Sequence, residues 1–151
     1  MYFGGNAGSE ACEVAMKMSY QTHYDSGKIE KKWFISREQS YHGSTSDALA
    51  LGERPNLEFF RQMLSPYRAR IPMHHPLYLQ RDGESIDDYA RRSAKELEDK
   101  ILEIGPDYVC GFVGETIMGG LVGDVPPAPN YWKYIRDVCN KYDIHLILDE
   151  V

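Results

Sequence analysis

The spacing of apolar residues along the chain predicts three amphipathic helices. From Ala11 to Met18, apolar side chains recur at helical spacing, and we expect this helix to end near residue 24. The same spacing marks residues 86–103 and 131–142. Ser85 stands before the second of these helices and is followed by an acidic first turn, a combination that is typical of a helix start.

Three shorter runs are typical of strands. Residues 108–113 are continuously apolar and residues 144–148 are apolar except for His145, so both are predicted to be strands buried on both faces, while residues 32–37 are mostly apolar and aromatic. Each of the first two runs follows an amphipathic helix and leads to a carboxylate, Glu115 or Asp149. This alternation predicts an α/β fold in which a mostly parallel sheet is flanked by helices.

The middle of the chain has a weaker pattern, which prolines interrupt. Short helices are predicted over residues 45–51 and 56–64, and residues 67–79 predict an irregular excursion with a brief extended piece. This excursion contains His74 and His75. Because no third ligand follows at a useful spacing, we predict no metal site there.

Composition and charge exclude several classes of partner. The 151 residues suffice for one domain, and 23 acidic against 17 basic residues give a net charge of −6. Without a basic stripe or a long apolar run, we expect no nucleic-acid partner and no membrane association. The three cysteines are far apart, so we predict neither a disulfide framework nor a zinc site. A reducing, cytoplasmic compartment fits this pattern best, and a mitochondrial location of a full-length form stays open.

The glycine-rich stretch before the first helix is the first candidate for chemistry. Residues 4–9 read Gly-Gly-Asn-Ala-Gly-Ser and run directly into the helix. The first N–H groups of a helix lack intrahelical partners and carry partial positive charge, so they suit an anion such as a phosphate. An ordinary loop with a serine N-cap explains the same segment equally well.

Further candidates stand where an open α/β sheet places its ligands, after the ends of strands. Tyr41 lies in the loop after residues 32–37, and Asp149 ends the last apolar run. A phosphate cradle at Gly8 and Ser9, an aromatic ring and a carboxylate together suit a flat, phosphorylated, heteroaromatic cation. Pyridoxal phosphate has these properties, and a carboxylate keeps its ring nitrogen protonated.

Three motifs carry a family resemblance: Asn6-Ala7-Gly8-Ser9-Glu10-Ala11, Tyr41-His42-Gly43, and the segment from Gly114-Glu115-Thr116 to Asp149-Glu150-Val151. In this order and at this approximate spacing they resemble class III pyridoxal-phosphate aminotransferases of the ω-aminotransferase group. The resemblance covers essentially the whole chain. It implies part of the large domain of the fold type I pyridoxal-phosphate transferases. Ala7, Cys12 and Thr116 depart from the residues that are usual in the family.

The resemblance implies one set of residues that bind pyridoxal 5'-phosphate: Gly8, Ser9, Tyr41, His42, Glu115, Asp149 and Val151. The first two would hold the phosphate, and Tyr41 would stack on the pyridine ring. Asp149 would pair with the ring nitrogen, and Val151 would pack on the opposite ring face. Glu115 would support the surroundings of Asp149. The alternatives are a surface role for Tyr41, helix capping by Asp149 and Glu150, and a loop-scaffold role for Glu115.

The resemblance also implies a missing catalytic group. In the family, the lysine that holds the cofactor as a Schiff base follows the Asp-Glu-Val strand. The eight lysines of this chain fall on helices and turns that we expect to be exposed, and none stands at that place. We therefore expect no catalytic residue in this chain. Residues 1–151 would be a partial cofactor-binding large domain, truncated at both ends and without the small domain.

The implied activity of a full-length form is transamination between an amine or amino acid and a 2-oxo acid, at the interface of a homodimer. The 151-residue chain is expected to be inactive alone. A pyridoxal-phosphate lyase of the same family is one alternative. The other is a non-catalytic pseudoenzyme or partner subunit that binds a phosphorylated ligand.

Overall fold

One parallel sheet organises the computed structural model, which describes residues 7–53 and 55–151. The sheet has four strands in the order β2-β1-β3-β4, and every neighbouring pair runs parallel. The strands are β1 (Trp33–Arg37), β2 (Arg68–Ile71), β3 (Val109–Glu115) and β4 (His145–Asp149). The expected α/β fold with a mostly parallel sheet is confirmed.

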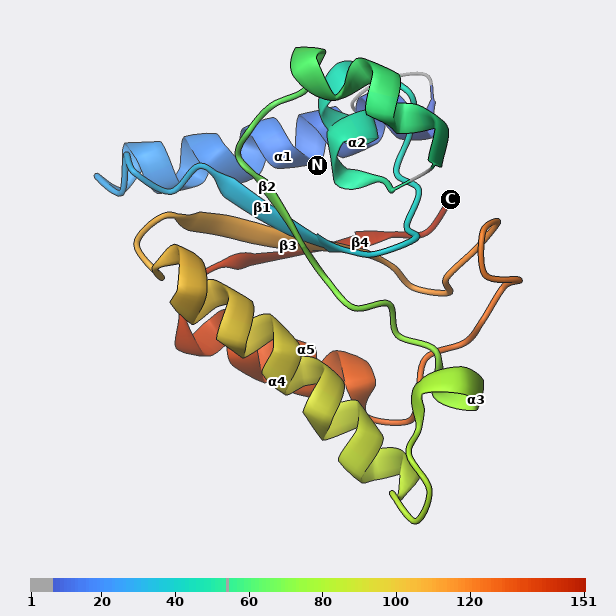
Figure 1. Ribbon diagram of the computed structural model, residues 1–151. Helices are drawn as coiled ribbons and strands as arrows, with labels where there is room; N and C mark the ends of the chain where they lie inside the picture. The colour runs from blue at the N-terminus through green and yellow to red at the C-terminus, as the bar shows by residue number, and fades with distance from the viewer. Residues whose placement is uncertain (1–6, 54) are drawn as a thin grey trace.

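Helices cover both faces of this sheet (Figure 1). On one side lie α1 (Gly8–Asp25) and α2 (Ser46–Leu51), and on the other lie α4 (Ile86–Ile104) and α5 (Tyr131–Lys141). A 3-10 helix η1 (Pro55–Met63) follows α2, and the short α3 (Pro76–Leu79) precedes α4. In the described part of the chain, none of these helices is long and apolar enough to cross a membrane.

The apolar core is divided by the sheet into two clusters. The larger joins the sheet to α4 and α5 and includes Ile35, Leu97 and Phe112, each fully buried. The smaller lies under α1 and α2 and includes Met16 and Leu51. Cys12, Cys110 and Cys139 are free and buried, and burial raises the pKa of each thiol to about 11 or 12.

The structure corrects three local expectations. The brief extended piece within residues 67–79 is a full sheet strand, β2, held at the sheet edge by its pairing with β1. The helix expected over residues 56–64 is the 3-10 helix η1. Ser9 does not cap α1, because Ala7 holds the N-cap position and the Ser9 hydroxyl accepts a hydrogen bond from the Ser44 N–H instead.

The expectation that every lysine is exposed is also wrong at one position. Lys31 is only 5% exposed. Its Nζ donates to the backbone oxygens of Pro106, Val109 and Tyr142, at 3.0 to 3.2 Å. Burial lowers its pKa from the ordinary value. The side chain therefore joins the segment before β3 and the first residue of β3 to the residue that follows α5.

Candidate functional site

A pocket of about 390 Å³ lies where β1, β3 and β4 end and α1 begins. Its walls come from five separate segments of the chain. They are Gly8, Ser9, Tyr41, His42, Gly43, Glu115, Gly119, Gly120, Asp124, Asp149 and Val151. All seven residues that the sequence nominated for cofactor binding are therefore brought together. Gly4, Gly5 and Asn6 of the glycine-rich stretch lie outside the described residues.

The parallel register of the sheet aligns two carboxylates at this pocket. Glu115 pairs with Asp149 at the ends of β3 and β4. Because neighbouring parallel strands end at the same edge, these side chains meet although they are far apart in sequence. The sheet thus supplies the rigid floor on which the loops place the remaining groups.

Asp149 is held as an anion by two donors. Its Oδ2 lies 2.8 Å from Nδ1 of His42, whose side chain is fully buried. Its Oδ1 accepts from the Val151 N–H at 3.1 Å. Burial alone raises the pKa of this carboxyl, but the bonds from His42 and Val151 outweigh that effect and the pKa is lowered. An ionised carboxylate therefore faces the pocket at neutral pH.

The start of α1 approaches the loop after β1 so closely that only glycine fits. Gly43 has a φ of 134°, and a Cβ on it would stand 2.5 Å from Oγ of Ser9. A Cβ on Gly8 would stand 2.8 Å from the Val151 side chain. The first N–H groups of an 18-residue helix open at this place. This backbone cradle suits an anionic group.

Glu115 is the second carboxylate of the pocket, and its pKa is shifted in the opposite direction to that of Asp149. Its Oε1 accepts from the Gly119 N–H at 3.4 Å, while the buried Oε2 has no partner among the described residues. Burial raises its pKa, against the lowering effects of His42 and Arg37. The carboxyl of Glu115 is thus more readily protonated than that of Asp149.

The sequence did not nominate Gly119, Gly120 or Asp124, which form one wall of the pocket. The sequence showed only a Gly- and Pro-rich loop here. In the structure Met118 and Val125 form an antiparallel bridge, which folds the loop back on itself, and Asp124 adopts a φ of 56°. The consecutive glycines, which leave part of this wall without side chains, were the only local signal in the sequence.

His74 anchors the far end of this loop. Its Nε2 accepts from the Ala128 N–H at 3.0 Å, and Ser93 Oγ lies 3.1 Å from Nδ1. The ring stacks on Tyr89 and Tyr131. Burial lowers the pKa of this imidazole to about 3, so it is neutral. Among the described residues, no group of three or more His, Cys, Asp or Glu side chains is placed to hold a metal ion.

Tyr41 and Val151 stand at the open side of the pocket, and Tyr41 is 40% exposed. No lysine is among the described residues that line the pocket. What the chain provides is thus a binding pocket with an anion cradle at one end and an ionised carboxylate at the other.

Comparison with known proteins adds sequence relatives to this geometry. A family model described as "Aminotransferase class-III" matches residues 1–151. An uncharacterized aminotransferase of Schizosaccharomyces pombe is 38% identical over 99% of this chain and 33% of its own length. The mitochondrial gamma-aminobutyrate transaminase 1 of Oryza sativa subsp. indica is 34% identical over 99% of this chain and 29% of its own. The chain thus spans about one third of the length of these relatives.

Solved structures show the same arrangement of elements. The omega transaminase of Pseudomonas jessenii in complex with PMP matches with a TM-score of 0.88 and 38% identity, over 97% of this chain and 32% of that one. A PLP-bound aminotransferase mutant from Vibrio fluvialis matches with a TM-score of 0.84 and 32% identity, over 95% and 31% of the two chains.

Proposed function

The chain belongs to the class III aminotransferases, and from that membership we propose that its pocket binds pyridoxal phosphate in a transaminase. The reaction proposed for the whole protein moves an amino group between an amine or amino acid and a 2-oxo acid. Pyridoxal phosphate, when bound, supplies the electron sink for bond breaking at the amino-bearing carbon.

One observation carries the proposal: a single pocket joins the helix start at Gly8 and Ser9 to the ionised carboxylate of Asp149. A ligand with a phosphate and a cationic ring nitrogen needs an anion cradle and a carboxylate in one cavity. Tyr41 lines the same pocket and offers an aromatic face.

The residues present fit this cofactor on three counts. The close approach of Gly43 to Ser9 leaves the backbone of the cradle bare of side chains, as a bound phosphate requires. Nε2 of His42 and Oε2 of Glu115 are buried without partners among the described residues, which is costly unless a ligand or water completes them. The bond from His42 keeps Asp149 ionised, as pairing with a pyridinium nitrogen requires.

Each residue then has a distinct part in the proposed function. The N–H groups at Gly8 and Ser9 would bind the phosphate, and Tyr41 and Val151 would hold the ring from its two faces. Asp149 would keep the ring nitrogen protonated, and His42 would orient Asp149 through the bond at Nδ1. Glu115, with its raised pKa, would hold a proton close to Asp149 without adding a second negative charge.

Assembly as a homodimer is proposed for the whole protein. Support comes from large apolar side chains on η1: Phe59 is 85% exposed and Met63 is 79% exposed. Such side chains commonly mark an interface. The cytoplasmic location stays a prediction from the sequence.

Titration with pyridoxal phosphate tests the binding proposal directly. The chain is expected to bind the cofactor reversibly, and Asp149→Asn should raise the Kd about ten-fold because the ring nitrogen loses its counter-charge. Asp143→Asn is the matched control, since Asp143 pairs with Lys28 at the surface, away from the pocket. Equal Kd values for the two variants would contradict the assignment of Asp149.

A graft tests the proposed reaction. Residues 7–151 replace the matching third of the Pseudomonas jessenii omega transaminase, which supplies the remaining two thirds of a catalytic chain. The graft is expected to transfer amino groups, and Asp149→Asn within it should abolish transfer while Asp143→Asn should not. A folded graft that binds pyridoxal phosphate but transfers no amino group would refute the reaction.

A further inference from the structure

A second cavity, of about 190 Å³, lies on the other side of the loop that carries Tyr41. It is bounded by the end of α2, the segment after η1 and strand β2. Three arginines and one carboxylate line it: Arg61, Arg68, Arg70 and Glu53. Gly52 and Ser65 are among the uncharged residues that complete the wall. The two cavities share no lining residue.

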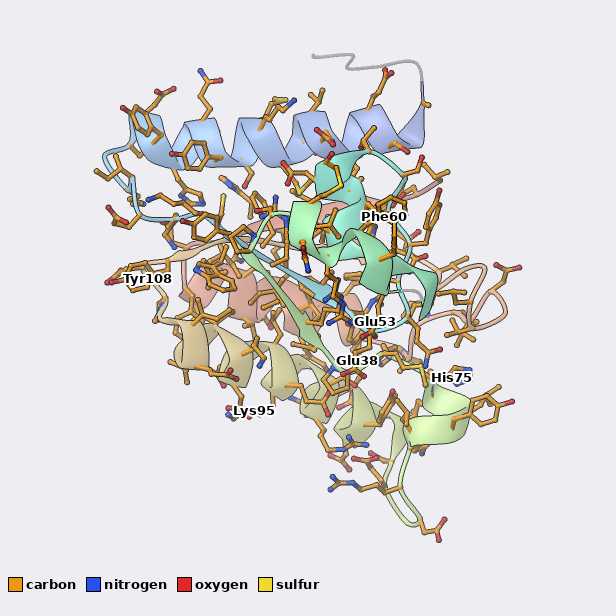
Figure 2. The ribbon with its side chains drawn as sticks, turned by 45° about the horizontal axis from the view of Figure 1, so that its top comes forward. Glu38, Glu53, Phe60, His75, Lys95 and Tyr108 are labelled. Atoms are coloured by element: carbon orange, nitrogen blue, oxygen red, sulfur yellow. The ribbon has the colours of Figure 1, made fainter. Side chains whose placement is uncertain are left out.

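The alternation of β2 brings two of these arginines to one face. Arg68 and Arg70 are two residues apart on the strand and point to the same side, while Ala69 and Ile71 pack into the large core on the other. Figure 2 shows Glu53 between β2 and the helix that carries Phe60. The sheet edge therefore presents two guanidinium groups to a cavity under η1 rather than to open solvent.

Both guanidinium groups are held in place by bonds to the protein. Arg68 Nη2 donates to Asp47 Oδ1 at 2.8 Å, and its side chain is only 8% exposed. Arg70 Nη2 donates to the backbone oxygens of Ala50 and Gly52, at 2.8 and 2.5 Å. Fixed in this way, the groups lose little freedom when a ligand binds.

Arginines outnumber carboxylates among the residues that line this cavity, although Asp47, which pairs with Arg68, lies just outside the lining. Arg70 is bonded to carbonyl oxygens, and within the described residues its hydrogen bonds run through Nη2 alone. Burial lowers the pKa of both Arg68 and Arg70, and Arg61 adds to the lowering at Arg70. Glu53 and Glu38 act in the opposite direction at Arg70. With Arg68 paired to Asp47, a bound anion would complement the guanidinium charge that Glu53, the carboxylate in the lining, shares with the arginines.

We propose that this arginine cavity is a second ligand site, separate from the cofactor pocket, which binds the phosphate group of a small phosphate monoester. Planar guanidinium groups bind phosphate oxygens through paired N–H donors, and three of them on one cavity match a dianion better than a single carboxylate. The volume leaves room for an organic group attached to the phosphate.

The site is also linked to the loop of the cofactor pocket. The Glu53 N–H donates to the Ser40 oxygen at 3.1 Å, and Glu53 Oε2 accepts from the Gln39 N–H at 3.3 Å. Residues 52 and 53 line the arginine cavity, and Glu53 also bonds to the turn after β1 that leads to Tyr41.

Amide chemical shifts of the 17.3 kDa chain can test the proposal one site at a time. Inorganic phosphate is the first probe and glycerol phosphate the second, with sodium chloride at matched ionic strength as the screening control. Saturable shifts at Gly52 and Ser65 are expected from both phosphates and not from chloride, and the glycerol ester is expected to bind more tightly. Equal or tighter binding of free phosphate would overturn the monoester assignment.

Variants separate this cavity from the cofactor pocket. Arg70→Gln and the exposed Arg61→Gln should each raise the Kd at Gly52 and Ser65 about ten-fold. Arg91→Gln, which removes an equal charge from the surface of α4, should leave it unchanged. Shifts at Gly8, Ser9 and Gly43 report on the cofactor pocket and should not respond to these variants.

Two results would overturn the arginine site. One is the absence of saturable shifts at Gly52 and Ser65 in the unaltered chain. The other is an unchanged Kd in Arg61→Gln, a variant whose exposed position does not endanger folding. Shifts at Gly8 and Ser9 that persist in either case would leave the proposed cofactor pocket standing, so the two proposals fail independently.

Discussion

The two faces of the sheet differ in how many apolar and polar side chains they bury. The face under α4 and α5 buries 14 apolar residues in one cluster, whereas the face under α1 and α2 buries 7 among the described residues. Polar groups occupy much of the second face. Ser19 contacts Cys110 and His145, and His23 bonds to the Cys110 oxygen.

This difference follows from where the pocket lies. The residues at the start of α1 and in the loop before α2 must leave backbone and polar atoms open to a ligand, so they contribute little apolar burial. The α4 and α5 face reaches the pocket through the loop anchored by His74 and through Arg37, which bonds to the Glu115 oxygen and lies over the Trp132 ring. The molecule thus keeps most of its hydrophobic stabilisation on one face and its binding groups on the other.

The largest expected effect is a loss of stability on the α4 face. Leu97 is fully buried, and Leu97→Ala should lower the free energy of unfolding by about 2–5 kcal/mol because it leaves a cavity. Leu102→Ala, at a side chain that is 53% exposed on the same helix, should change it by less than about 0.5 kcal/mol. Urea unfolding measures both. Similar losses for the two variants would contradict the burial of Leu97 in the larger core cluster.

A substitution on the site face, which is the face of the sheet under α1 and α2, should weaken ligand binding as well as lower stability. Gly43→Val places a branched side chain at a φ of 134° against Ser9. It should cost about 1–3 kcal/mol of stability and weaken pyridoxal phosphate binding by more than about ten-fold. Fluorescence titration measures the binding; intact binding in Gly43→Val would contradict the cradle.

Low pH should destabilise the fold mainly through His74, which packs on the α4 face of the sheet. The pKa of His74 falls from 6.5 to about 3 on folding, so between these values the unfolded chain binds a proton that the folded chain does not. Stability is therefore lost as the pH falls below 6.5, by about 2 kcal/mol at pH 5.

His23 and His145, on the site face, also have lowered pKa values through burial and add to the same slope. Unfolding measured from pH 7.5 to 5 should show a shallower slope in His74→Gln than in His23→Gln. The reverse order would place the main acid-sensitive group under α1.

The smallest expected effect compares two lysines close in sequence. Lys31→Met should lower the free energy of unfolding by about 1 kcal/mol, because three backbone oxygens lose a donor while the cost of burying a charge disappears. Lys28→Met removes an exposed pair with Asp143 and should change it by less than about 0.5 kcal/mol. A larger loss at Lys28 in thermal unfolding would contradict the buried role of Lys31.

Local pattern was enough to predict most of the secondary structure. The helices α1, α4 and α5 and the strands β1, β3 and β4 were all predicted, because each has a pattern of apolar residues that one chain segment expresses alone. The burial expected for β4 on both faces was wrong, since β4 is the last strand of the described sheet and Leu148 is 41% exposed. The motifs around Ser9, Tyr41 and Asp149 were visible for the same reason. The sequence by itself thus determined the α/β class, the order of the elements and the residues nominated for the site.

Tertiary structure decided what no single segment expresses. Strand β2 has two arginines in four residues and becomes a strand only by pairing with β1. Lys31 is buried because three distant carbonyl groups converge on its ammonium. Asp124 reaches the pocket only because its loop folds back between Met118 and Val125. These features depend on contacts between segments far apart in sequence, and the energy of such contacts is not contained in the periodicity of either segment.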